Sequence, residues 1–361
     1  MVLLTIEVKG MIEVDGSFGE GGGQLLRYSV ALSAILGAPI KVFNIRAKRT
    51  NPGLRPQHMT AIKLIASIVE AEIEGLKVGS MTVTFKPKTP PKGGNYNMDI
   101  GTAGSISLVL QASLPVLTFA TSMVTLRMIG GTSVRWSPPV PYFKEVLLPL
   151  FKKMGVNAEV KILRRGFYPR GGGLVETRVK PVDSLSPIKM DKFNEVKEIR
   201  GISYCSNLPS HVAVRQANSA KQVLRKAGYE DVEIEIDTKT PSPGKGSGIV
   251  LWAITDTGIV GGDSIGERGK KAEIVGQEAA EKLIKALRSK VPVDDHALDN
   301  LIIYMSLAKG ESYVVAKELT SHAETAMKLC GDIARAKFTV EKENNYIKIF
   351  CKGIGVSRKF K

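Results

Sequence analysis

The sequence is poor in cysteine and in aromatic residues. The 361 residues include three cysteines, Cys205, Cys330 and Cys351, which are far apart and show no CxxC spacing. An odd number of distant cysteines excludes a disulfide scaffold and argues against a cysteine-ligated zinc site. Aromatic residues make up 6% of the chain, so the core has to be mostly aliphatic.

We expect neither a membrane-spanning segment nor a secretory signal in this sequence. The best candidate for a span, 106–124, contains Gln111, Pro115 and several Ser and Thr residues and has no basic flanks, so we expect a buried core helix. The start, MVLLTIEVKG, alternates in polarity like a strand and carries Glu7, which is unlike a signal peptide. We therefore expect a cytoplasmic protein with no membrane association.

The sequence has fewer acidic residues than basic residues. The chain has 51 Lys and Arg residues against 35 Asp and Glu residues, which gives a net charge of +16. Its hydrophobic and charged fractions, 43% and 24%, are typical of a globular protein. The excess of positive charge predicts a polyanionic partner, namely nucleic acid, a nucleotide or an anionic membrane surface. A generally basic proteome is the alternative explanation.

Strand-like and helix-like patterns alternate along the chain. Apolar periodicity and turn residues predict helices and strands in close succession, which favours an α/β or α+β fold with mixed sheets. The expected helices are 25–36, a helix beginning at Pro56, 104–119 and 143–154, and the expected strands are 39–45, 81–85 and 123–128. The glycine run 19–23 has a weak echo at 170–173, which hints at repeated units larger than those of solenoids.

A second pattern begins after the linker-like segment 182–187, VDSLSP. We expect there a strand, a helix, a strand, a loop, a strand and a helix, at 199–205, 212–227, 232–236, 238–248, 249–255 and 272–287. The chain is therefore predicted to hold a small α/β domain at 185–275 inserted into a large domain at 1–184 and 276–361.

The stretch from Asp15 to His58 is the richest in candidate binding residues. A triple glycine opens the first helix, so backbone amides and the helix dipole can meet an anion there. Glu20 lies inside this run, which is sensible if Mg²⁺ bridges a carboxylate and a phosphate; a tight turn with a solvated Glu is the alternative. Arg46 and Arg49 belong to a basic stretch without acidic residues and are candidates for a terminal phosphate, or for a solvated basic loop.

Familiar nucleotide motifs are absent. The chain has no GxxxxGK[ST] motif and no kinase signature, so any use of ATP follows another route. Residues 137–142, SPPVPY, offer a rigid wall for a nucleobase or form an ordinary loop. Four histidines lack metal-ligand spacing. His322 follows Thr320-Ser321, which predicts a helix start that keeps the imidazole neutral and nucleophilic, unless this histidine is structural.

Assembled in order, these segments resemble the RNA 3′-terminal phosphate cyclase family. The matching motifs are DGSFGEGGGQLLR, IRAKRTNPGLRPQH, IGTAGSISLVLQ, GGTSVRWSPPVPYF, GFYPRGGG, DDHALDNLIIYMSLA and SHAET. The resemblance implies an α/β large domain of repeated βαβαββ-like units with an inserted thioredoxin-like domain. It also implies a ligase-type enzyme that uses ATP and Mg²⁺ or Mn²⁺ to convert an RNA 3′-phosphate into a 2′,3′-cyclic phosphodiester, through a histidine–AMP intermediate and an adenylylated RNA end.

The resemblance assigns roles to individual residues. His322 would be the nucleophile and Glu20 the metal ligand. The residues that would bind phosphates of ATP or of the RNA end are Arg27, Arg46, Arg49 and Gln57. The residues that would bind the adenosine are Gln111, Pro138, Tyr142, His296 and Asp299.

The sequence departs from the family at two places. Ala326 stands where the family often has Asn, and His296 stands where bacterial members have Tyr, which weakens the assignment around the nucleotide. Two other functions are compatible with the composition: a cyclase-like ribosome-assembly factor that has lost catalysis, and an enolpyruvyl-type transferase. His322 together with Glu20, Arg46 and Arg49 favours the enzyme, and a small substrate gives no reason for a charge of +16.

Overall fold

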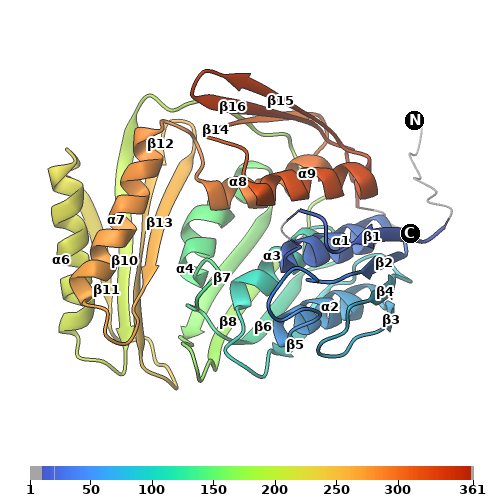
Figure 1. Ribbon diagram of the computed structural model, residues 1–361, viewed down its shortest axis with the longest axis horizontal. Helices are drawn as coiled ribbons and strands as arrows, with labels where there is room; N and C mark the ends of the chain where they lie inside the picture. Colours follow the sequence, from blue (N-terminus) through green and yellow to red (C-terminus); the bar gives the residue numbers. More distant parts are fainter. Residues whose placement is uncertain (1–9, 20, 359–361) are drawn as a thin grey trace.

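The structure, a computed structural model, describes residues 10–19 and 21–358. The start of the expected N-terminal strand, including Glu7, and the candidate metal ligand Glu20 lie outside the described residues. The described part contains four sheets of four strands each (Figure 1). It is an α/β fold with mixed sheets, as the pattern of helices and strands predicts.

Three of the sheets share one topology. In each, the first strand pairs in parallel with the second, and the fourth strand pairs in antiparallel fashion with the second and the third. The strand orders are β1-β2-β4-β3, β5-β6-β8-β7 and β9-β14-β16-β15. The strands of the first are β1 (Ile12–Asp15), β2 (Ile40–Phe43), β3 (Glu72–Glu74) and β4 (Val83–Lys86); those of the second are β5 (Gly94–Asp99), β6 (Val124–Gly130), β7 (Asn157–Arg164) and β8 (Gly173–Lys180); those of the third are β9 (Lys189–Met190), β14 (Glu311–Ala316), β15 (Lys337–Glu343) and β16 (Tyr346–Lys352).

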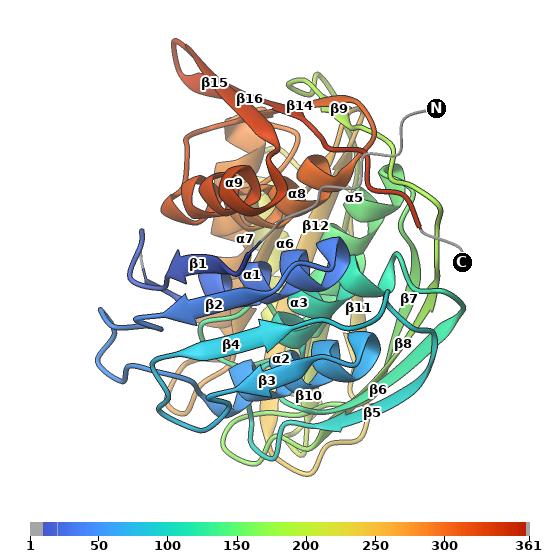
Figure 2. The same ribbon diagram turned by 90° about the vertical axis from the view of Figure 1, so that its right-hand side faces the viewer.

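The helices of these repeated units share one hydrophobic core. Figure 2 shows α1, α3, α8 and α9 between the sheets of the repeats. The helices are α1 (Gly23–Leu36) and α2 (Pro56–Val69) in the first unit, α3 (Ile106–Leu117), α4 (Val140–Tyr142), η1 (Phe143–Leu147) and α5 (Leu148–Lys153) in the second, and α8 (Asp295–Leu307) and α9 (Ser321–Ala334) in the third. The expected helix 143–154 therefore begins with a π-helical turn, and α3 is the buried core helix that its polar residues predict. No helix in the described ranges is long and apolar enough to cross a bilayer.

A fourth sheet with its own core interrupts the third repeated unit between β9 and α8. Its strands lie in the order β11-β10-β12-β13, and its helices pack in a separate hydrophobic cluster. The elements are β10 (Val196–Ser206), α6 (His211–Lys226), β11 (Val232–Asp237), β12 (Gly246–Thr255), β13 (Ile259–Ile265) and α7 (Ala272–Arg288). Because α7 supplies Val275, Ala279 and Leu283 to this second core, we propose that the inserted domain ends after α7 rather than at residue 275.

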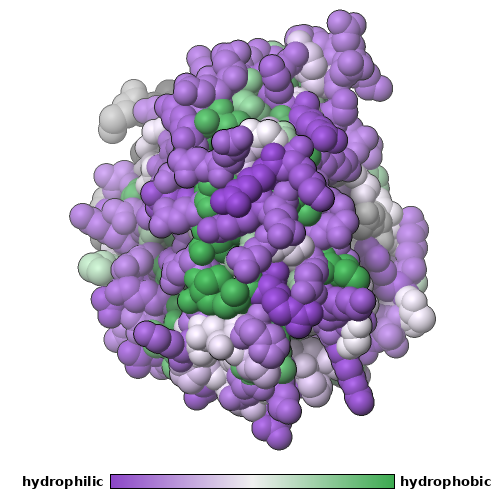
Figure 3. Space-filling view, turned by 90° about the vertical axis from the view of Figure 1, so that its left-hand side faces the viewer, coloured by the Kyte–Doolittle hydropathy of each residue, from purple (hydrophilic) through white to green (hydrophobic). Residues whose placement is uncertain are grey.

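The outer face of this inserted unit is mostly hydrophilic (Figure 3), whereas its interior is a hydrophobic cluster. Figure 3 shows hydrophilic residues over most of the face on that side of the molecule, with hydrophobic residues in small groups between them. This pattern fits a solvated surface rather than a large apolar interface. The likeness of the unit to thioredoxin stays a prediction.

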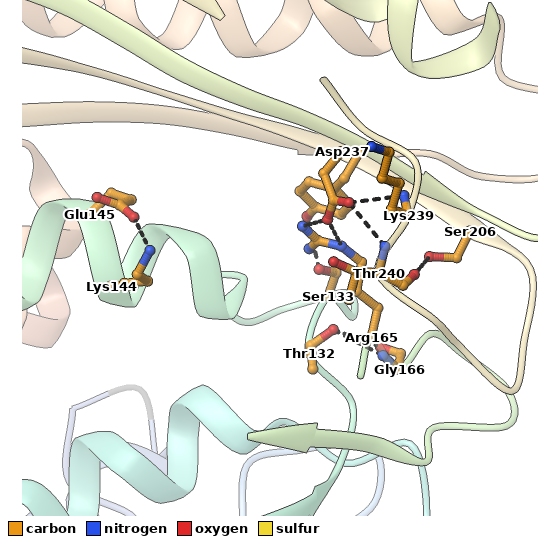
Figure 4. Close-up of polar contacts among 11 residues, drawn as sticks. Thr132, Ser133, Lys144, Glu145, Arg165, Gly166, Ser206, Asp237, Lys239 and Thr240 are labelled. Carbon is orange, nitrogen blue, oxygen red and sulfur yellow. Dashed lines mark hydrogen bonds and ion pairs between the residues drawn. The ribbon is translucent and has the colours of Figure 1, made fainter. Parts of the chain in front are cut away.

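Buried polar contacts join the inserted unit to the second repeat. Figure 4 shows Arg165, which follows β7, pointing at Asp237 at the end of β11, and the distance from Arg165 Nη2 to Asp237 Oδ2 is 2.6 Å. The Arg165 guanidinium also lies 3.9 Å from the centre of the Tyr204 ring, and the Tyr204 hydroxyl lies 2.8 Å from Ser133 Oγ. These contacts fix the loop after β6 against the inserted sheet.

Candidate active site

The N-termini of α1 and α9 meet at the glycine-rich loop. Gly22 caps α1, and the Thr320 side chain caps α9 by accepting a hydrogen bond from a backbone amide, as the sequence predicts. His322 Nδ1, in the first turn of α9, lies 2.9 Å from Gln24 Oε1, in the first turn of α1. The positive ends of two helix dipoles and their amides therefore lie together, and this arrangement favours an anion.

The contact with Gln24 favours one tautomer of His322. An amide oxygen only accepts hydrogen bonds, so Nδ1 of His322 carries the proton in this contact. The lone pair of a neutral imidazole is then on Nε2. A neutral ring held in one tautomer at a site for phosphates is suited to nucleophilic attack on phosphorus.

Close packing fixes the glycine loop against α9. Gly19 has a φ of +58°, in the left-handed region that favours glycine, and a Cβ there would stand 2.3 Å from Thr325 Oγ1. The carbonyl oxygen of Gly19 accepts a hydrogen bond from Lys48 Nζ at 3.4 Å. The loop therefore has no room for side chains at this contact, and it lies beside the basic segment after β2.

A buried cation and a buried histidine lie under the start of α1. A Cβ on Gly23 would stand 2.3 Å from His58 Nε2 and 3.1 Å from Arg27 Nη1. Burial, followed by the charges of Arg27, Arg46 and Arg55, lowers the pKa of His58 to about 3. Burial lowers the pKa of Arg27 to about 10, and its buried Nε has no hydrogen-bond partner among the described residues. A buried cation without a carboxylate is costly unless an anion binds beside it.

The two arginines predicted to bind a terminal phosphate, Arg46 and Arg49, make different contacts. Arg49 lies at the glycine run, because a Cβ on Gly22 would stand 3.3 Å from its Nη2. Arg46 donates from Nη1 to the carbonyl oxygens of Asn51 at 2.6 Å and Gly53 at 3.1 Å, so it shapes its own loop as well. Burial and the charges of Arg55 and Arg49 lower the pKa of Arg46, and this repulsion is relieved by an anion.

A third group of predicted residues gathers at the start of α8. The Tyr142 hydroxyl donates to Asp294 Oδ1 at 2.5 Å, and the rings of Tyr142 and His296 lie edge to face with centroids 6.1 Å apart. Asp299 is 6% exposed and accepts a hydrogen bond from Thr320 Oγ1. Burial raises the pKa of Asp299 to about 7. Since Thr320 caps the helix of His322, this group adjoins the histidine.

Gln57, Gln111 and Pro138 lie around the start of α3. Gln57 Oε1 accepts a hydrogen bond from the Ser105 amide at 3.2 Å, and the Pro138 carbonyl accepts one from Ser107 Oγ at 2.5 Å. Gln111 is buried one turn further along the same helix. Contacts thus connect the arginine cluster, His322 and the Tyr142 group, although their residues come from all three repeated units.

Several residues of the site were not expected from the sequence. Gln24 and His58 stand within the quoted motifs, and their places beside His322 and Gly23 depend on contacts over long sequence separations. Asp294, which also accepts a hydrogen bond from the Gly261 amide at 2.7 Å, ties the site to β13 of the inserted unit. Within the described ranges no three His, Cys, Asp or Glu residues form a metal cluster, and Glu20 lies outside those ranges.

An α/β protein that brings together a histidine, the buried Arg27, the more accessible Arg46 and Arg49, and two helix N-termini has the features of a class that binds phosphates. A family model described as RNA 3′-terminal phosphate cyclase matches residues 18–340. Relatives named RNA 3′-terminal phosphate cyclase include a Pyrobaculum aerophilum protein, 46% identical over 349 residues, with 96% of this chain and 99% of the relative covered. An Ignicoccus hospitalis protein of the same name is 51% identical over 319 residues, with 87% and 90% covered. The chain therefore belongs to the RNA 3′-terminal phosphate cyclase family, whose name is that of an enzyme.

Proposed function

We propose that this protein converts an RNA 3′-terminal phosphate into a 2′,3′-cyclic phosphodiester with ATP, through a covalent histidine–AMP and an adenylylated RNA end. Family membership supports the overall activity. The observation that carries the mechanism is the contact between His322 and Gln24, which sets a nucleophilic imidazole at the glycine-rich loop and its arginines.

In the first step, Nε2 of His322 attacks the α-phosphorus of ATP. A nitrogen–phosphorus bond forms, the bond to the bridging oxygen breaks, and pyrophosphate leaves. Charge on the transferring and leaving phosphates is met by the amides of the glycine loop and by Arg27 and Arg49. Attack through Nε2 leaves the ring of His322 cationic with its proton on Nδ1, and release of that proton to water makes the adduct neutral.

In the second step, an oxygen of the RNA 3′-phosphate attacks the phosphorus of the adduct, and the bond to His322 breaks. The product is an RNA 3′-phosphate joined to AMP through a pyrophosphate bridge. In the third step, the neighbouring 2′-oxygen attacks the 3′-phosphorus, its proton is released, and AMP leaves with the bridging oxygen. In this proposal, Arg46, Arg49 and Gln57 hold the 3′-phosphate for both transfers.

The predicted adenosine residues lie at the starts of α3 and α8. Tyr142 and His296 offer ring faces and edges, Gln111 offers an amide, and Pro138 offers a rigid apolar surface. Asp299, with a pKa of about 7, is partly protonated near neutral pH and can then donate as well as accept a hydrogen bond. These groups suit an uncharged nucleoside better than a phosphate.

A divalent ion, Mg²⁺ or Mn²⁺, is proposed as the cofactor, with Glu20 as its protein ligand. The described residues contain no group of three His, Cys, Asp or Glu side chains that could hold a metal ion. Mg²⁺ typically binds one or two carboxylates together with substrate phosphates. A single glutamate in a phosphate-binding loop fits this mode of binding. When bound, such an ion neutralises phosphate charge during transfer. We place the reaction in the cytoplasm, where the three buried, unbonded cysteines would remain reduced.

Labelled ATP tests the covalent step. Incubation with α-labelled ATP and Mg²⁺ should label the protein with AMP through an acid-labile, alkali-stable bond, and His322→Ala should remove the label. His211→Ala is the matched control, because His211 also begins a helix, α6, in the inserted unit. A label that survives His322→Ala would refute the nucleophile. A wild-type protein that binds RNA and takes no label would instead support the ribosome-assembly function.

A further inference from the structure

Two aromatic side chains stand almost fully in solvent. Trp136 is 93% exposed and Tyr168 is 79% exposed, the highest values for large hydrophobic residues in the described part of the chain. Trp136 also has a φ of +61°, in the left-handed region that a bulky side chain rarely adopts. No packing interaction accounts for a tryptophan held out in this conformation, and backbone strain of this kind gathers at functional loops.

The two loops that carry these rings are joined. The amides of Thr132 and Ser133 both donate to the carbonyl oxygen of Gly166, at 2.8 and 3.3 Å, and Ser133 forms a parallel bridge with Phe167. Arg135, next to Trp136, is close enough to Tyr168 to be affected by it: the ion pair with Glu267, and then Tyr168, raise the pKa of Arg135. Trp136 and Tyr168 therefore belong to one surface.

This surface is basic. We define the aromatic surface as the loops 133–138, 164–172, 238–246 and 266–270, which are connected by the bonds Arg165 N to Pro241 O, Arg170 Nη1 to Pro243 O and Arg135 to Glu267. The loops contain eight Lys and Arg residues and a single acid, Glu267; Arg165 is buried and paired with Asp237, so seven of the eight contribute cations to the surface. The basic residues are Arg135, Arg164, Arg165, Arg170, Lys239, Lys245, Arg268 and Lys270. Exposed rings among cations match the chemistry of a single-stranded polynucleotide.

The aromatic surface continues from the candidate active site. Pro138, two residues beyond Trp136, is bonded to Ser107 at the start of α3, where Gln57 is bonded to Ser105. On the other loop, a Cβ on Gly171 would stand 2.8 Å from Ala103 Cα, just before the same helix. A strand whose 3′-phosphate reaches Gln57 and Arg49 can therefore pass these two rings as it leaves the site.

We propose that Trp136 and Tyr168 stack on unpaired bases of the RNA just upstream of the 3′-terminal nucleotide, while Arg135, Arg170 and Lys245 face its phosphates. This inference rests on the proposed function, because the RNA end sets the direction of the strand. Every base has a flat face, so such a platform binds single strands of any sequence. The low aromatic content of the chain as a whole is compatible with recognition by two rings at one place.

Fluorescence anisotropy tests the platform in the full-length protein without ATP. The probes are 5′-labelled hexanucleotide RNAs with a 3′-phosphate, either intact or abasic at the second and third positions from the 3′ end. Trp136→Ala and Tyr168→Ala should each weaken binding of the intact RNA at least about fivefold, and should have little effect on the abasic RNA. Trp136→Phe and Tyr168→Phe should retain most of the affinity, because a ring remains.

Two controls separate stacking from other effects. Met123→Ala removes another exposed hydrophobic side chain, 62% exposed, at the opposite end of β6, and should leave RNA affinity unchanged. In a Trp252→Phe background, Trp136 is the remaining tryptophan, so intact RNA should quench its emission and abasic RNA should not.

Unchanged affinity in both alanine variants, or equal losses on intact and abasic RNA, would overturn the platform and leave the surface to another kind of partner. The adenylylation test is independent of these measurements. A wild-type protein that takes no AMP but shows the abasic pattern would refute the proposed function alone, and a labelled protein without that pattern would refute the platform alone.

Discussion

Asp299 provides a quantitative test of the site's electrostatics. Burial at 6% exposure raises its pKa from 3.8 to about 7, so between these values the folded protein holds a proton that the unfolded chain has lost. Stability from this group is complete below about pH 4 and is lost as the pH rises through 7. A rise of the pKa from 3.8 to about 7 corresponds to about 4 kcal/mol of stability. Asp299→Asn mimics the protonated acid and should escape this loss.

Urea unfolding of wild type and Asp299→Asn at pH 4 and pH 8 measures this difference. The two proteins should be similar at pH 4, and the variant should be more stable at pH 8 by up to about 4 kcal/mol. Glu311→Gln is the control, because this residue is an exposed acid on β14, away from Asp299, and should leave the difference in stability between the two pH values as it is in the wild type. Parallel pH dependence in wild type and Asp299→Asn would refute the account of a buried, protonated carboxyl.

Three further substitutions test the phosphate site. Arg27→Met removes a buried charge whose Nε has no hydrogen-bond partner within the described part of the chain, so it should stabilise the ligand-free protein by about 1 kcal/mol or more. It should also remove the rise in melting temperature that ATP produces. A ligand-free variant that is less stable than the wild type would show that the buried charge has a partner. Arg49→Ala should reduce cyclisation of 3′-phosphate RNA more than binding of 3′-hydroxyl RNA, whereas equal losses would make Arg49 a general backbone contact. Gly23→Ala places a Cβ 2.3 Å from His58 Nε2, so it should lower adduct formation and reduce the free energy of unfolding by about 1–3 kcal/mol. Gly37→Ala is the control, because Gly37 lies at the other end of the helix with open space around it, and this variant should keep the adduct. Equal adduct yields in the two variants would contradict the tight packing of the glycine loop.

Much of the fold could be predicted because its helices have strong periodic signals. The helix at 25–36, the helix beginning at Pro56 and the pattern of the inserted unit are confirmed within a few residues at their ends. Short polar strands such as β3 and β5 gave no hydrophobic alternation to detect. The third repeated unit was hidden because its first strand, the two-residue β9, is separated from α8 by the whole insertion.

The candidate site was predictable only as separate motifs. The glycine run, the basic segment and the capped helix of His322 each have a local physical signature. Their meeting depends on contacts such as that of His322 with Gln24, 298 positions apart, which periodicity and capping cannot predict. The exposure of Trp136 was likewise unpredictable, since a tryptophan beside two prolines could equally have packed inward.

The central claim is that His322 carries AMP to an RNA 3′-phosphate. The most direct measurement isolates the labelled protein, maps the AMP by proteolysis and mass spectrometry, and then chases the adduct with RNA. We predict AMP on the tryptic peptide 318–328, which contains His322, and its release as free AMP together with a 2′,3′-cyclic end when the RNA carries a 3′-phosphate but not a 3′-hydroxyl. AMP on another peptide, or an adduct that 3′-phosphate RNA does not discharge, would contradict the account.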